Sequence, residues 1–177
     1  MPKAEKRVVS VPQMGKAMLS FAIACVTEGD CLVSEIERNV KAVERMADPD
    51  FWFEFYAFAL FPCDVALFNC GVAQATDVRR EATRQAYENL SSFFAKKSQP
   101  HMSVPEWNQL YHDRTAEYWD CIKDGTGKAL ELLGMVATMR ILKTPDMLVS
   151  VCAALSYANS FKVLPALINC YEIHSPG

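Results

Sequence analysis

Apolar residues recur every three or four positions through most of this chain. Between residues 13 and 46 this spacing places one apolar side chain per turn on the same face of an α-helix. It predicts two helices separated at residues 28–30, or one long helix in which residues 28–30 mark a close contact, and we favour a kink or helix end at Gly29 over a ligand-binding role. The residues that carry the pattern are Met14, Met18, Phe21, Cys25, Leu32, Ile36, Val40 and Val43.

Two later segments, 77–97 and 104–123, are amphipathic in the same way. In the first, Arg84 and Glu88 stand four positions apart and are expected to form an ion pair along the helix. The inward positions expected in the second are Trp107, Leu110, Tyr111, Tyr118 and Ile122.

Four local signals mark helix starts. The segments 10–13 and 103–106 match the capping-box pattern, in which a hydroxyl and a Gln or Glu side chain satisfy early backbone N–H groups. The segments 48–50 and 144–146 each offer a cap residue, then proline, then an acid that the helix dipole favours. No Asn-Gly hairpin signal is present. These signals favour helices over strands.

Three segments are apolar on almost every side: 51–70, 128–142 and 146–171. Pro62 is expected to kink the first of them or to start a new helix there, because proline removes a backbone donor and clashes with the preceding turn. The fold predicted from these patterns is an all-α, single-domain bundle of six or seven helices with a kinked, largely buried central helix. Residues 1–10 and 172–177 are expected to be loose tails.

Segment 51–70 has the length of a membrane span. However, Glu54 and Asp64 would each cost ~3 kcal/mol near the middle of a bilayer, Pro62 breaks the segment, and Lys162 interrupts the apolar C-terminal segment. We therefore expect no membrane span.

The location expected from the sequence is cytoplasmic. The start of the chain lacks the pattern of a secretory signal. The seven cysteines are an odd number with no C-x-x-C spacing, which favours free thiols in a reducing compartment.

The net charge and the composition of the chain indicate which classes of binding partner to expect. The net charge of −3, with no cluster of lysine and arginine, argues against nucleic acid. Hydrophobic residues make up 51% of the chain, which is more than the few amphipathic helices are expected to cover. We expect the remaining apolar surface to be buried between two copies of the chain in a homodimer. The expected ligand is an apolar small molecule or a partner helix.

The acidic stripe Asp113, Glu117 and Asp120, with His112 beside it, is a candidate metal site. Carboxylates at positions i, i+4 and i+7 share a helix face and suit a hard cation, and histidine would add affinity for a transition metal. The alternative is a solvated acidic face that pairs with arginines at positions 79, 80 or 84. The sequence indicates no particular cofactor.

Glu54, Asp64 and His112 are the candidate catalytic residues. A carboxyl group in an apolar helix has a raised pKa and is suited to proton transfer. The alternatives are that Glu54 lies on a wet helix edge and that Asp64 stabilises a first helical turn after Pro62.

We thus expect a homodimeric binding or interaction module with an apolar pocket or partner surface. The alternative is a metal-dependent enzyme that uses the cluster of carboxylates and histidine.

Overall fold

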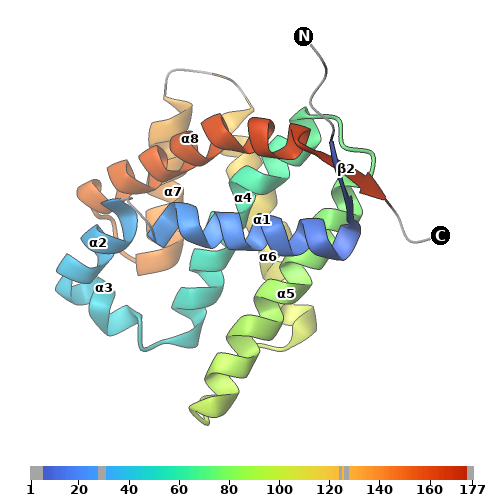
Figure 1. Ribbon diagram of the computed structural model, residues 1–177. Coiled ribbons are helices and arrows are strands. Elements are labelled where there is room, and N and C mark those ends of the chain that lie inside the picture. Colours follow the sequence, from blue (N-terminus) through green and yellow to red (C-terminus); the bar gives the residue numbers. More distant parts are fainter. Residues whose placement is uncertain (1–5, 28–30, 124, 126–127, 175–177) are drawn as a thin grey trace.

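The computed structural model describes residues 6–27, 31–123, 125 and 128–174. Within these residues the chain forms eight helices and two short strands, which confirms the predicted all-α class (Figure 1). The elements in chain order are β1 (Arg7–Ser10), α1 (Val11–Thr27), α2 (Cys31–Arg38), α3 (Val40–Arg45), α4 (Pro49–Asn69), α5 (Ala75–Lys96), α6 (Val104–Ile122), α7 (Ala129–Leu142), α8 (Met147–Asn169) and β2 (Tyr171–His174).

There are more helices than the predicted six or seven because the segment from residue 13 to residue 46 is divided among α1, α2 and α3. Asn39 separates α2 from α3, and its side-chain oxygen accepts a hydrogen bond from the backbone N–H of Ala42 at 3.1 Å. The break predicted at residues 28–30 lies outside the described residues.

The predicted helix caps form, except that at one helix the capping residue is not the predicted one. Both capping boxes, at 10–13 and 103–106, are present, and Asp48 caps α4. At the start of α8 the cap is Asp146 and not Thr144, because the Asp146 carboxylate accepts from a backbone N–H in the first turn.

Helix α4 is the buried centre of the molecule. Fifteen of its 21 residues are buried, and α1, α5, α6, α7 and α8 pack around it (Figure 1). The helix runs without interruption through Pro62, so the alternative of a new helix beginning at this proline is wrong. The predicted central helix is therefore one continuous element.

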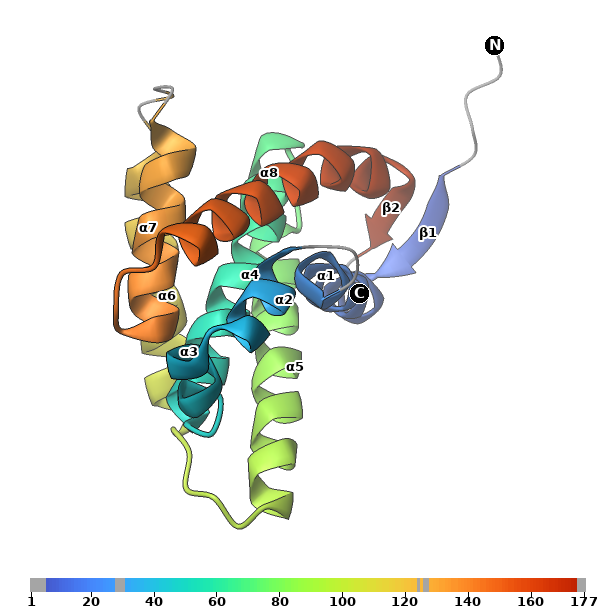
Figure 2. The ribbon, with the colours of Figure 1, turned by 90° about the vertical axis from the view of Figure 1, so that its left-hand side faces the viewer.

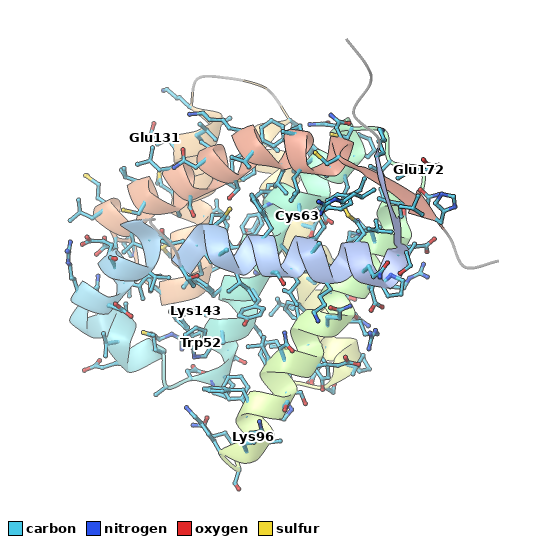
Figure 3. All side chains as sticks on the ribbon, viewed as in Figure 1. Trp52, Cys63, Lys96, Glu131, Lys143 and Glu172 are labelled. Carbon is cyan, nitrogen blue, oxygen red and sulfur yellow. The ribbon has the colours of Figure 1, made fainter. Side chains whose placement is uncertain are left out.

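Buried cysteines serve as small apolar residues in this core. Figure 3 shows Cys63 where α1 crosses α4, and its thiol donates a hydrogen bond to the Met18 carbonyl over 3.6 Å. Burial raises the pKa of the Cys63 thiol, so its reactive thiolate form is disfavoured.

Strands β1 and β2 join the two ends of the chain. They pair in parallel, with Arg7 opposite Tyr171 and Ser10 opposite His174 (Figure 1). Val9 and Ile173 are partly buried against the core. Residues 7–10 and 172–174 therefore differ from the loose tails predicted for them, because half of each strand finds apolar surface to cover.

The predictions of no membrane span and of a cytoplasmic location are contradicted. Helices α4 and α8 are both long and apolar enough to cross a membrane, each with a mean hydropathy of 1.4 over an 18-residue window. The protein covers them differently: 83% of the α4 window is buried inside the molecule, compared with 33% of the α8 window. Both helices meet this criterion although Glu54 and Asp64 lie in α4 and Lys162 lies in α8.

Candidate functional site

Helices α7 and α8 carry most of the exposed apolar surface of the molecule. Of the fourteen large hydrophobic residues exposed among the described residues, nine lie on these two helices. We call them the α7–α8 apolar face: Leu130, Leu132, Met135, Met139, Met147, Leu148, Val151, Leu155 and Val163. In Figure 2, α7 stands at the left edge, and α8 begins beside it and runs obliquely across the upper part of the molecule to β2.

The face is hollowed into a groove of about 590 Å³. Its walls come from both helices and from Pro145 in the connection between them, and they include Met135, Val151 and Leu155. Glu131 and Asp146 are its charged lining residues. The groove therefore offers an almost wholly apolar concave surface.

Small residues let α7 and α8 come close enough to form this groove. A Cβ atom at Gly134 would lie 2.2 Å from the carbonyl oxygen of Ser150 and 3.1 Å from the Cβ of Ala154. Only glycine fits at such a contact with backbone. On α8 a small residue, Ala154, faces this position, so both helices contribute small residues to the contact.

Glu54 is buried in α4 and bound by basic groups from two other helices. Arg114 of α6 donates to both of its carboxylate oxygens, at 2.6 and 2.7 Å. Lys143, at the end of α7, donates at 3.3 Å, and Figure 3 shows it beside α4. Glu54 therefore lies in a buried ion-pair cluster and not on a wet helix edge.

The same cluster includes Glu117, one of the candidate metal ligands. Arg140 of α7 binds both oxygens of Glu117, at 2.6 and 2.9 Å, and Arg114 lies 3.6 Å away. Tyr118 is buried next to these charges, and burial raises the pKa of its hydroxyl. This arrangement ties α4, α6 and α7 together.

Asp64 occupies a different environment on the same helix. Tyr111 of α6 donates its hydroxyl hydrogen to Asp64 at 3.0 Å, and the Arg79 guanidinium of α5 lies 3.9 Å away. Burial raises the pKa of Asp64 to about 7, and Arg79 and Tyr111 oppose part of that rise. Asp64 therefore exchanges its proton near neutral pH, as a general acid or base requires.

Two adjoining hollows meet beside Asp64. The first, of about 340 Å³, is lined by Asp64 and Phe68, and the second, of about 420 Å³, by Tyr111 and His112. Three residues line both hollows: Thr76, Arg79 and Trp119. We call this pair of hollows the α5–α6 groove.

The structure thus brings together two of the three candidate catalytic residues. Asp64 and His112 line adjoining hollows. Glu54 lies ten residues from Asp64 along α4, about 15 Å at the helical rise, and its carboxylate is occupied by Arg114 and Lys143.

Only two of the four proposed metal ligands are neighbours among the described contacts: the His112 ring lies 3.5 Å from the Asp113 carboxylate. Asp120 pairs with Lys123 at 2.9 Å, and Glu117 belongs to the buried cluster. Among the residues that the structure describes, no group of three or more His, Cys, Asp or Glu side chains is placed to hold a metal ion. The alternative partners of the stripe, the arginines at 79, 80 and 84, instead pair with other acids.

Sequence reasoning missed the basic partners of both buried acids. These partners, Arg79, Arg114 and Lys143, come from outside α4, and no spacing rule connects them to it. The acids themselves could have indicated that such partners exist, because a carboxylate buried in an apolar helix requires a hydrogen-bond donor from a neighbouring element.

Comparisons with known proteins give no match: no family model, no curated protein and no solved structure is similar to this chain. Its function is therefore inferred from its own residues.

Proposed function

We propose that this protein is a homodimeric interaction module in which the α7–α8 apolar face packs against the same face of a second copy. The observation that carries the proposal is the concentration of nine exposed large hydrophobic residues on two adjacent helices. Contiguous apolar patches larger than a few hundred Å² are rare on monomers and mark interaction surfaces.

The area suits a stable interface. At about half exposure each, the nine side chains present on the order of 900 Å², compared with the roughly 800 Å² that each partner of a standard interface buries. A two-fold axis would place the same patch on both sides of the contact, which is the commonest arrangement of oligomers.

The shape and the residue types support a protein partner. The groove is concave, so a helix of the second copy would fill it better than a flat surface would. Met135 and Met147 line it, and unbranched thioether side chains adapt to the shape of a partner.

A lipid bilayer is the competing occupant, since α8 has the length and hydropathy of a span. The charged residues that line the groove itself are both acidic, Glu131 and Asp146, and would repel an anionic membrane surface. The basic residues of these helices lie outside the groove lining, and two of them are paired: Arg140 with Glu117 and Lys143 with Glu54.

The test is the mass of the purified chain by light scattering at micromolar concentration. The unmodified protein is expected to have the mass of a dimer. Val151→Glu places a charge at the centre of the face and is expected to weaken association at least about tenfold, because a desolvated carboxylate would have no partner there.

Val104→Glu is the matched control. Val104 is 49% exposed on α6, compared with 51% for Val151, and it lies outside the face. This variant is expected to remain a dimer. A monomeric mass for the unmodified protein, equal effects of the two substitutions, or a monomer that sediments with phosphatidylcholine vesicles would each contradict the proposal.

A further inference from the structure

The α5–α6 groove is distinct from the apolar face and has the lining of a small-molecule site. Each of its two hollows falls within the roughly 300–1,000 Å³ of typical ligand pockets. The walls of the first hollow combine the aromatic rings of Trp119 and Phe68 with the charged groups of Arg79 and Asp64. Typical ligand sites have this mixture of apolar wall and a few polar groups.

Arg79 differs from the other arginines of α5 in having uncommitted donors. Arg80 pairs with Asp77 at 3.3 Å, and Arg84 is held by Glu81 and Glu88. The guanidinium of Arg79 lies 3.9 Å from Asp64, too far for a hydrogen bond, and its side chain is 46% exposed. It is therefore the group in this groove best placed to bind an anion.

Trp119 supplies a flat wall next to this cation. Its ring lies edge-to-face with Phe61 and Phe68, with centroids 5.9 Å apart in both pairs, so its orientation is held by packing. Thr115 also lines the second hollow, but its hydroxyl oxygen is buried and does not open into it, so the polar recognition rests on Arg79.

We infer that the α5–α6 groove binds a small planar organic anion, with its carboxylate or phosphate on Arg79 and its ring against Trp119. Guanidinium groups bind carboxylates and phosphates through paired hydrogen bonds, and indole rings stack on planar ligands.

Asp64 makes this binding dependent on pH. The groups that face it are Arg79 from α5, Tyr111 from α6 and Cys63 on its own helix. With the pKa of Asp64 raised to about 7, its carboxylate repels a bound anion above neutral pH, whereas below it the protonated group does not. Anion affinity is therefore expected to rise as the pH falls from about 8 to about 6.

The experiment measures the binding of three probes by calorimetry: benzoate, phenyl phosphate and the neutral benzamide. At least one of the two anions is expected to bind more tightly than benzamide, and comparing them distinguishes a carboxylate site from a phosphate site. Arg79→Gln is expected to reduce anion affinity about tenfold or more, because charged hydrogen bonds are lost. Arg84→Gln, on the same helix but paired outside the groove, is the control and is expected to bind as the unmodified protein does.

Asp64→Asn tests the pH dependence separately. It keeps an acceptor for the Tyr111 hydroxyl and removes the charge, so anion affinity is expected to become independent of pH between about 6 and 8 and to rise several-fold at about pH 8. His112 lines the second hollow, so His112→Gln is measured beside it and is expected to retain the pH dependence.

Three results would overturn the inference. They are no binding of either anion at millimolar concentration, equal affinity for the anions and benzamide, and an Arg79→Gln variant that binds as well as Arg84→Gln. The far-ultraviolet circular dichroism of each variant reports whether it is folded, and Arg79→Lys, which keeps the charge, is expected to recover part of the affinity.

Discussion

Glu54 and Asp64 lie in the same apolar helix, and their surroundings give them different roles. Glu54 is bound at both oxygens by Arg114 and is also reached by Lys143, so its charge is compensated at short range. Asp64 has a tyrosine hydroxyl and a more distant guanidinium, and burial raises its pKa to about 7. In the sequence both residues are acids within an apolar segment, so the sequence does not tell them apart. Only their neighbours in the folded protein distinguish an acid held in an ion pair from one that titrates near neutral pH.

The buried pair predicts a large loss of stability when one partner is removed. Arg114→Met is expected to lower the free energy of unfolding by about 3 kcal/mol, because it leaves the Glu54 carboxylate buried with Lys143 alone. The double variant Glu54→Met, Arg114→Met is expected to recover most of that loss. Urea denaturation with linear extrapolation measures both.

Arg84→Met serves as the control for lost arginine charge, since the ion pairs of Arg84 lie at the surface. It is expected to have little effect. A single and a double variant that are equally unstable would show that the cost comes from lost packing and not from the unpaired charge.

At the scale of the helix, some apolar helices are covered by neighbouring helices and others remain partly exposed to solvent. Helices α4, α7 and α8 are all poor in charge, yet α4 is enclosed by five neighbours, whereas α7 and α8 retain exposed apolar faces. Hydrophobic periodicity could not make this distinction, because it records how apolar a helix is and not which elements pack on it. The contact between α7 and α8 depends on Gly134, where a side chain would collide with backbone.

Gly134→Ala is therefore expected to destabilise the protein by about 2 kcal/mol, even though alanine has the higher helix propensity. The added Cβ would lie 2.2 Å from the carbonyl oxygen of Ser150, so α7 and α8 must move apart. Thermal unfolding followed by circular dichroism measures the change.

Gly15→Ala is the matched comparison in α1. There the new Cβ would lie 2.7 and 2.9 Å from the Cγ and Cβ of Glu81 and 3.1 Å from the backbone N of Ala82, so α1 and α5 must shift by less than the 2.2 Å contact with the Ser150 carbonyl requires of α7 and α8. A smaller loss is expected than for Gly134→Ala. A stabilised Gly134→Ala variant would contradict the close contact between α7 and α8.

At the scale of the whole molecule, strands β1 and β2, from opposite ends of the described chain, pair with each other. The N–H of Arg7 donates to the carbonyl of Cys170 at 3.0 Å, and the parallel pairing of β1 and β2 continues from there. These strands are too short to be stable alone, so they depend on apolar contact with the helices. That contact comes from Val9 and Ile173, which pack on the core.

Replacing both Val9 and Ile173 by alanine is expected to lower the stability by about 2 kcal/mol, or roughly 4–8 °C in Tm for a chain of this length. Val8→Ala is the control within the same strand, because Val8 is 66% exposed. Differential scanning calorimetry measures the three proteins. A Tm unchanged by the double substitution would mean that the strand pairing adds nothing to the fold.

The amino-acid sequence by itself determined the helical class, most helix boundaries and the burial of segment 51–70, since caps, proline positions and apolar spacing are local properties. It also identified Glu54 and Asp64 as unusual acids. Only the tertiary structure decided which basic groups meet them, that Asp64 and His112 border one groove, and that α7 and α8 keep an open apolar face. It also showed that helices long and apolar enough for a membrane are present and are covered to different extents. The physical reason is that each of these features joins residues from different helices, and their meeting depends on how the helices pack and not on spacing along the chain.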